Sequence, residues 1–93
     1  MKKTLSEKEV IALTNRVLAE SFEIEEERLL PEKRIFADLG LDSLDTVDLV
    51  VALQKRFSIT IREDERVRSI RSLGDLYTYI MTVQQEQQAG TEG

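Results

Sequence analysis

The sequence predicts an all-α protein, a bundle of three substantial helices and one short helix with a long loop after the first helix. Two observations predict this class. Along three separate stretches, apolar residues recur at intervals of three and four, which is the spacing of one face of an α-helix. Two of these stretches also begin with residues that cap helices. The length of 93 residues fits one domain with one modest core.

The first helix is expected from about residue 6 to residue 21. Two overlapping capping-box patterns, Thr4 with Glu7 and Ser6 with Glu9, mark its start. Its apolar face is formed by Val10, Leu13, Val17, Leu18 and Phe22.

Residues 23–42 show no sustained period and contain Pro31, so we expect a loop there. It is long compared with the usual loop of about 4 to 6 residues in a compact domain. We therefore expect apolar side chains to pin it against the helices. The candidates are Ile24, Leu29, Leu30, Ile35, Phe36 and Leu39.

The second helix is expected over residues 43–57, with Asp42 as its N-cap and Asp45 in its first turn. Its apolar residues cover more than a narrow stripe, so the helix is either central or apolar on two sides. They are Leu44, Val47, Leu49, Val50, Val51, Leu53 and Phe57. We assign to the core Val47, Val50, Leu53, Phe57, Ile59, Leu76 and Ile80.

The rest of the chain is expected to be an extended linker over residues 58–61, a short helix near residues 63–67 and a last helix over residues 72–83. Residues 84–93 read QQEQQAGTEG and have no apolar period, so we expect a disordered tail. Residues 1–83 would then form the domain.

Composition excludes several classes of function. The chain has no cysteine and no histidine, so it lacks disulfides, thiolate catalysis, the commonest metal ligands and the usual general base. We therefore expect neither an enzyme nor a metal site. A net charge of −5 argues against nucleic acid as a partner, and no apolar run is long enough for a membrane span. A small cytoplasmic protein is expected.

The negative charge is concentrated around one serine. Between residues 35 and 53 the chain has four aspartates and no basic residue, which supplies −4 of the net −5. A calcium loop beginning at Asp38 is excluded, because Ser43 stands where glycine belongs and Leu49 where glutamate belongs.

Ser43 lies at the start of the second helix, just after Gly40. The unpaired N–H groups and the positive dipole end of a helix start would stabilise a phosphate attached there. No histidine is available to activate the hydroxyl, so the pattern favours modification of the serine over catalysis. A plain helix cap is the alternative.

The stretch DLGLDSLDTVDLVVALQKRF resembles the signature of acyl carrier proteins, in which the serine of D-S-L receives 4′-phosphopantetheine. The loop LLPEKRIFADLG and the ending SIRSLGDLYTYI follow the same pattern, so the resemblance covers about residues 5–83. It implies the four-helix bundle of that family. It also implies a carrier whose thiol comes from the prosthetic group rather than from a cysteine.

Carried over to this sequence, the resemblance makes Ser43 the attachment point for phosphopantetheine taken from coenzyme A. The implied partners are a phosphopantetheinyl transferase of the holo-carrier synthase type and enzymes that load, condense and transfer acyl groups. A monomeric carrier in fatty-acid, polyketide or related specialised acyl metabolism is expected. The core residues would line a cleft that shelters the bound acyl chain.

The resemblance also implies a surface that recognises partners, formed by Asp42, Leu44, Asp45, Asp48, Val51, Lys55 and Arg56. Other roles remain open: Asp42 and Asp45 would also cap the helix, Asp48 would also fit a solvated face, and Leu44 and Val51 would also fit core packing. Fatty-acid-synthesis carriers stay acidic where this chain has Lys55 and Arg56. This departure suggests a specialised rather than a housekeeping carrier.

Two other functions remain open at this stage. A peptidyl or aminoacyl carrier would share the bundle and the serine. A carrier-like bundle that is never modified would act as a protein-interaction subunit.

Overall fold

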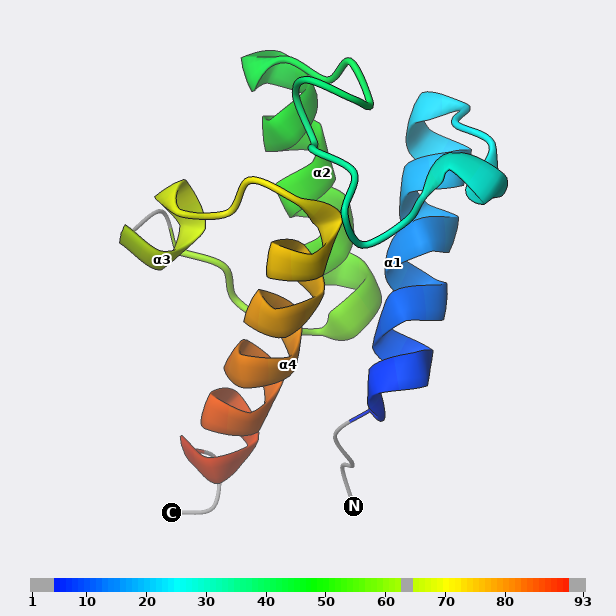
Figure 1. Ribbon diagram of the computed structural model, residues 1–93. Coiled ribbons are helices and arrows are strands. Elements are labelled where there is room, and N and C mark those ends of the chain that lie inside the picture. The colour runs from blue at the N-terminus through cyan, green and yellow to red at the C-terminus, as the bar shows by residue number, and fades with distance from the viewer. Residues whose placement is uncertain (1–4, 63–64, 91–93) are drawn as a thin grey trace.

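The computed structural model describes residues 5–62 and 65–90 of the chain. This part of the chain is all-α, with three long helices, one short helix and a long first loop, as the sequence predicts (Figure 1). Its elements are α1 (Glu7–Phe22), the 3-10 helix η1 (Glu26–Arg28), α2 (Ser43–Phe57), α3 (Glu65–Arg68) and α4 (Leu73–Gly90). No helix of the described residues is both long and apolar enough to cross a membrane.

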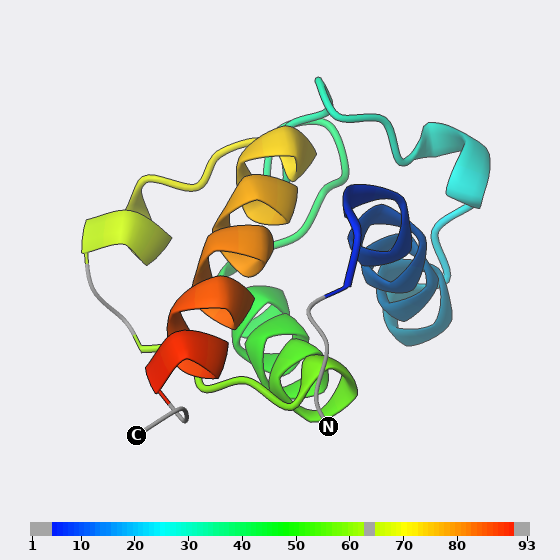
Figure 2. The ribbon, with the colours of Figure 1, turned by 90° about the horizontal axis from the view of Figure 1, so that it is seen from below.

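The three long helices lie alongside one another, and α1 packs against both α2 and α4 (Figures 1 and 2). The short helix α3 lies to one side of α4, away from α1. The loop between α1 and α2 passes over the end of the bundle opposite the start of α1 and the end of α4. As a result, the first turn of α2 lies at this far end of the molecule.

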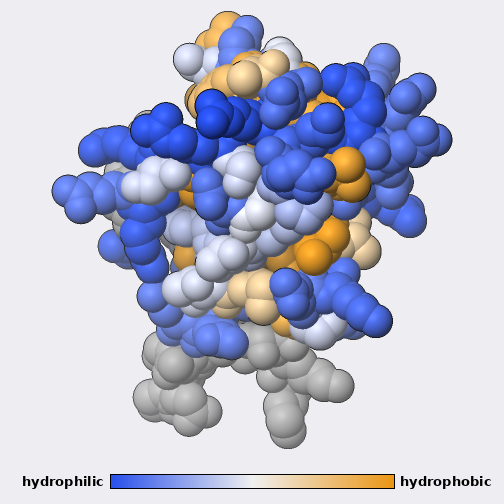
Figure 3. Space-filling view, in the orientation of Figure 1, coloured by the Kyte–Doolittle hydropathy of each residue, from blue (hydrophilic) through white to orange (hydrophobic). Residues whose placement is uncertain are grey.

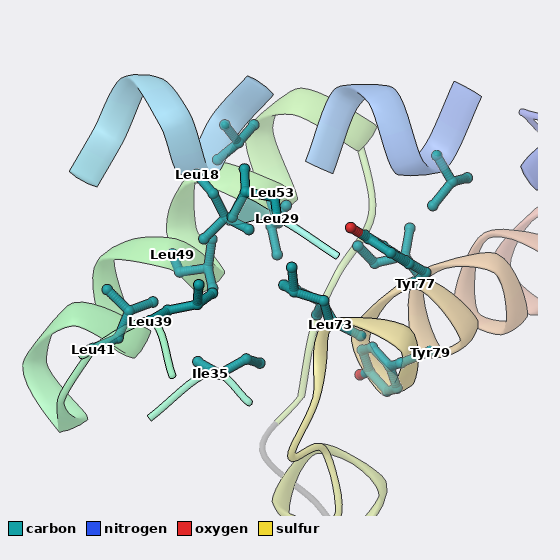
Figure 4. Packing of buried hydrophobic residues seen from close by; sticks show 14 of the residues in the cluster. Leu18, Leu29, Ile35, Leu39, Leu41, Leu49, Leu53, Leu73, Tyr77 and Tyr79 are labelled. Atoms are coloured by element: carbon teal, nitrogen blue, oxygen red, sulfur yellow. The ribbon is translucent and has the colours of Figure 1, made fainter. Parts of the chain in front are cut away.

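The core fills the space between the long helices and the loop. Figure 4 shows Leu18 of α1 beside Leu53 of α2, and Leu39 and Leu41 of the loop beside Leu49. The buried apolar residues are Val10, Val17, Leu18, Ile24, Leu29, Ile35, Leu39, Leu41, Leu49, Leu53, Ile59, Leu73, Leu76, Tyr77, Tyr79, Ile80 and Val83.

The start of α1 uses one of the two capping boxes that the sequence offers. Ser6 Oγ accepts from the N–H of Glu9 at 3.3 Å, and the N–H of Ser6 donates to Glu9 Oε1 at 2.9 Å. These two bonds satisfy N–H groups that a helix start leaves without intrahelical partners. Thr4, of the other pattern, lies outside the described residues.

The long loop is pinned to the start of α4 through backbone as well as through apolar side chains. The N–H of Ile35 donates to the carbonyl of Arg71 at 2.9 Å, and the N–H of Leu73 donates to the carbonyl of Lys33 at 3.0 Å. Bonds of this kind satisfy backbone groups that loop residues would otherwise leave unpaired. They fix the path of the chain on its way to α2.

Two of the expected loop anchors are wrong. Leu30 is 43% exposed and Phe36 is 53% exposed. Leu41, which was not among the expected anchors, is buried instead. The other four candidates are buried as expected. An irregular loop has no period that tells which of two adjacent apolar residues faces inward, so its path over the bundle decides.

The start of α4 is held by a carboxylate. Asp75 Oδ2 accepts from the N–H groups of Arg71 at 3.1 Å and Ser72 at 3.2 Å, and Ser72 Oγ accepts from the N–H of Asp75 at 3.2 Å. Both backbone N–H donors stabilise the charged carboxylate and hold the pKa of Asp75 below its ordinary value. The N–H of Arg71 has the larger effect and that of Ser72 the next.

Helix α4 continues to Gly90, seven residues beyond the end near Val83 that the sequence indicates. Two glutamines of the supposed tail make long-range hydrogen bonds that favour this extension. Gln84 is buried and exchanges two bonds with the backbone of Leu5, at 2.8 and 3.1 Å. Gln87 does the same with Thr60, at 2.7 and 3.0 Å. Residues 91–93 of the expected tail lie outside the described residues.

Candidate functional site

The first turn of α2 is ordered by two aspartates. Asp42 Oδ1 accepts from the N–H of Asp45 at 2.9 Å, and Asp45 Oδ2 accepts from the N–H of Asp42 at 3.1 Å. This reciprocal pair makes Asp42 the N-cap, as the sequence predicts, and Ser43 the first residue inside the helix. Capping is therefore done by Asp42 rather than by Ser43.

Ser43 is exposed, and its hydroxyl has no hydrogen-bond partner among the described residues. Its carbonyl accepts from Thr46 Oγ1 at 2.7 Å. The N–H groups of Ser43 and Leu44 come before the first intrahelical donor, and within the described chain no acceptor pairs with them. The hydroxyl is therefore free to react, and two backbone donors at the positive end of the helix can receive an anion attached to it.

Gly40 makes the turn that leads into this helix. Its φ is +75°, in the left-handed region, and its N–H donates to the carbonyl of Phe36 at 3.1 Å. A Cβ built on Gly40 would meet nothing within 4 Å. The turn therefore needs glycine for its backbone conformation and not for lack of space.

One face of α2 is apolar and exposed. Leu44 is 77% exposed, Val47 is 60% exposed and Val51 is 44% exposed, and Asp48 is exposed between them. These residues follow one another at helical spacing, so they form one stripe. In Figure 3 apolar residues reach the surface at the top of the molecule, above the end where α2 begins.

The assignment of Val47 to the core is wrong. Helix α2 has two apolar sides, and it buries the side that carries Leu49 and Leu53, which turns Val47 outward with Leu44 and Val51. The spacing of residues 44, 47 and 51 could have shown that the three share a face. Periodicity alone could not have shown which face is buried.

The two cations at the end of α2 differ in their contacts. Arg56 Nη2 lies 3.7 Å from Glu20 Oε1 of α1, an exposed pair of the kind that contributes about 0–1 kcal/mol. Lys55 is exposed and follows Val51 by one helical turn, so it continues the apolar stripe. Lys55 therefore continues the face that carries Leu44, Val47, Asp48 and Val51, and it also borders, with Arg56, a depression against α1.

Asp38, the remaining aspartate of the acidic segment, belongs to the loop. Its Oδ2 accepts from the N–H of Arg34 at 2.7 Å, so it stabilises the turn before Gly40. Among the described residues no group of three His, Cys, Asp or Glu side chains could hold a metal ion.

An apolar cavity of about 280 Å³ lies between α2, α3, α4 and the loop. Of the residues assigned to the core, Val50, Leu53 and Leu76 line it, while Ile59 and Ile80 are buried elsewhere and Phe57 is partly buried. Its lining is Ile35, Phe36, Thr46, Leu49, Val50, Leu53, Ile61, Val67, Arg68, Ile70, Leu76 and Tyr79.

Ser43 lies on the same side of α2 as two residues that line this cavity. Thr46 and Val50 follow Ser43 by three and seven residues, so all three share one side of α2. Val50 is about 10 Å from Ser43 along the helix axis, at 1.5 Å per residue. A long group attached to the Ser43 hydroxyl can therefore fold back toward the apolar lining.

Comparisons with known proteins agree with this geometry. Residues 15–80 match the family described as "Phosphopantetheine attachment site", which defines the class: a protein that carries a covalently bound phosphopantetheine arm. The chain is similar to an acyl carrier protein of Helicobacter pylori, with 41% identity over 64 residues that cover 69% of this chain and 81% of the relative.

The fold is similar to a crystal structure of an acyl carrier protein from Thermotoga maritima. The TM-score is 0.72 at 31% identity, and the match covers 86% of this chain and 92% of that one. The chain therefore belongs to the acyl carrier protein family, whose members are carriers and not enzymes.

Proposed function

We propose that Ser43 is the attachment residue, and that this chain carries acyl groups as thioesters on 4′-phosphopantetheine. In the loading step the Ser43 oxygen attacks the phosphorus that bears pantetheine in coenzyme A. A serine phosphodiester forms, the pyrophosphate bond breaks, and adenosine 3′,5′-bisphosphate leaves. The transferase takes up the hydroxyl proton, since the chain itself contains no histidine.

The observation that carries this proposal is the uncommitted hydroxyl at a capped helix start. Asp42 already provides the cap, so Ser43 is not needed for it. The free N–H groups of Ser43 and Leu44 would stabilise the phosphodiester anion. The prosthetic group supplies the thiol that a chain without cysteine lacks.

The cavity suits the apolar part of the cargo. Burying an acyl chain there removes methylene groups from water, at roughly 0.8 kcal/mol for each one. Because Thr46 and Val50 line the cavity on the same side of α2 as Ser43, the arm would carry the thioester toward it. Sheltered cargo would react more slowly with solvent nucleophiles.

We propose that the exposed face of α2 meets the partner enzymes. Leu44, Val47 and Val51 offer apolar contacts, and the carboxylates of Asp42, Asp45 and Asp48 would attract a basic patch and orient the encounter. The partners in this proposal are a phosphopantetheinyl transferase and the enzymes that load, condense and transfer acyl groups.

The sign of charge changes along this face. The face begins at the acidic first turn of α2 and ends at Lys55. Because Lys55 lies one helical turn after Val51, it would contact the same partner enzyme. Arg56 would contribute from the flank, beside Glu20. We therefore propose a specialised carrier, because a bipolar face would select enzymes other than those that recognise a uniformly acidic helix. We further propose that it acts as a monomer in the cytoplasm, where coenzyme A is supplied.

The test is modification in vitro. The purified chain is incubated with coenzyme A and a promiscuous phosphopantetheinyl transferase, and its intact mass is measured. We expect one phosphopantetheinyl group on the wild type and on Ser21→Ala, a control at an exposed serine of α1, and none on Ser43→Ala.

An unmodified wild-type chain would refute the carrier proposal and favour a protein-interaction subunit. Aminoacyl thioesters on protein isolated from the native host would instead favour the peptidyl carrier function.

A further inference from the structure

A second depression, of about 260 Å³, lies beside the apolar cavity. Three of its residues, Phe36, Arg68 and Ile70, also line the cavity, so the two spaces adjoin each other at these side chains. The depression is lined by Arg34, Phe36, Ala37, Arg68, Ile70 and Arg71. Arg68 therefore borders the apolar cavity itself, and Arg34 and Arg71 line the depression next to it.

These guanidinium groups have no side-chain partner within the described part of the chain. Arg34, Arg68 and Arg71 are exposed, and within the described residues their side chains form no hydrogen bond or ion pair. They come from three different places: the loop, the last turn of α3 and the segment before α4. The backbone bridge between Arg34 and Ser72 holds the loop beside that last segment, next to Arg71.

Two carboxylates of the same segments accept hydrogen bonds from backbone N–H groups rather than from the guanidinium groups. Asp38 accepts from the N–H of Arg34, and Asp75 accepts from the N–H groups of Arg71 and Ser72. The charge of Arg71 adds to the effect of these bonds in lowering the pKa of Asp75, so the two groups influence each other without an ion pair. The charged residues that line the depression itself are Arg34, Arg68 and Arg71.

The lining of the cavity comes from different elements on its different sides. Thr46 and Val50, on the side of Ser43, belong to α2, whereas Phe36, Arg68 and Ile70 belong to the loop and to the α3–α4 segment. A chain that enters beside Ser43 and crosses to the side of Phe36, Arg68 and Ile70 would end near the arginines. An alkyl end gains nothing from them, while an anionic end would form charge-assisted hydrogen bonds with them.

We propose that this carrier is adapted to acyl groups that bear a carboxylate at their distal end, with Arg34, Arg68 and Arg71 as the groups that receive it. The inference rests on the proposed attachment at Ser43. It makes the three arginines residues that determine cargo specificity.

The test compares two cargos of equal length. A promiscuous transferase loads the chain from adipoyl-coenzyme A, whose six-carbon acyl group ends in a carboxylate, or from hexanoyl-coenzyme A, whose acyl group ends in a methyl. Hydroxylamine then attacks the thioester carbonyl, giving a hydroxamic acid and the free thiol of the arm. The rate of cleavage, followed by intact mass, reports how well each cargo is sheltered.

We expect Arg68→Gln and Arg34→Gln each to speed cleavage of the adipoyl thioester about threefold, as expected for loss of one exposed ion pair, and to leave the hexanoyl rate unchanged. Arg34 does not line the apolar cavity, so its variant removes the charge without altering the cavity wall. Arg16→Gln, at an exposed position of α1, removes the same charge elsewhere and is expected to change neither rate.

Equal effects on both cargos, or an adipoyl rate that neither variant changes, would overturn the proposal. These outcomes differ from failure of the proposed function, in which the wild type would not take up the arm from either thioester. Thermal unfolding of the apo forms of Arg68→Gln and Arg34→Gln checks that each variant folds. If one of them is unstable, the other still tests the proposal.

Discussion

The two roles assigned to Asp42, helix cap and docking charge, can be separated by two substitutions. Asp42→Ala removes both the acceptor and the charge. Asp42→Asn keeps an oxygen that can accept from the N–H of Asp45, and removes only the charge. The other half of the capping box, from the N–H of Asp42 to the carboxylate of Asp45, does not involve the side chain at position 42 and survives in both variants.

The magnitude follows from that single lost bond. Replacing an N-cap aspartate by alanine costs about 1 kcal/mol, whereas asparagine caps about as well as aspartate. For a domain of this size, 1 kcal/mol corresponds to a fall of about 4–8 °C in melting temperature. We therefore expect a shift of that size for Asp42→Ala and a much smaller one for Asp42→Asn.

Modification kinetics test the second role. If Asp42 steers a basic transferase, both variants lower kcat/KM for phosphopantetheine transfer at low ionic strength, and the difference from the wild type shrinks in high salt. Urea denaturation followed by circular dichroism measures the cap, and intact mass against time measures the transfer. Equal destabilisation by Ala and Asn would refute the capping argument. An unchanged low-salt rate for Asp42→Asn would refute the docking argument.

Further predictions concern the two sides of α2, the start of α4 and the far end of the docking face. Val47→Thr should change the free energy of unfolding by less than about 0.5 kcal/mol, whereas Leu53→Ala should lower it by about 2–5 kcal/mol. Similar losses for both variants in urea denaturation would contradict the assignment of Val47 to the exposed side of α2 and of Leu53 to the buried side. Asp75→Asn should be less stable than the wild type at pH 7. Because the folded-state pKa of Asp75 is lowered, this difference should shrink as the pH falls below the unfolded-state pKa of about 3.9 and vanish once the pH is below the folded-state pKa. A difference that persists undiminished in strong acid would contradict this. At low salt, Lys55→Glu should bind more tightly than the wild type to a general ketosynthase that has a basic docking surface. The control Lys8→Glu, on α1, should bind as the wild type does. Equal Kd values for Lys55→Glu and the wild type would count against the bipolar face.

Helix starts were the most predictable part of the fold. Ser6 with Glu9 and Asp42 with Asp45 are local patterns, and a capping bond depends on residues only three apart. The same reasoning placed Ser43 at the start of α2. Local chemistry was therefore enough to locate the candidate site.

Features that depend on packing between distant segments were less predictable. Val47 and Phe36 are apolar but exposed, because α2 and the loop each present two apolar sides and the neighbours cover only one. The end of α4 was misplaced because Gln84 and Gln87 look like solvated tail residues in sequence. Their partners, including Leu5, are far away along the chain. The arginines around the depression come from three segments and form no sequence motif.

The central claim is that Ser43 carries the phosphopantetheine arm. The most direct measurement is fragment-ion mass spectrometry of the protein isolated from cells that make it naturally. We predict one phosphopantetheinyl group per chain, located on Ser43, with acylated species among the holo protein. An arm on another residue, or a chain that stays unmodified in those cells, would contradict the account.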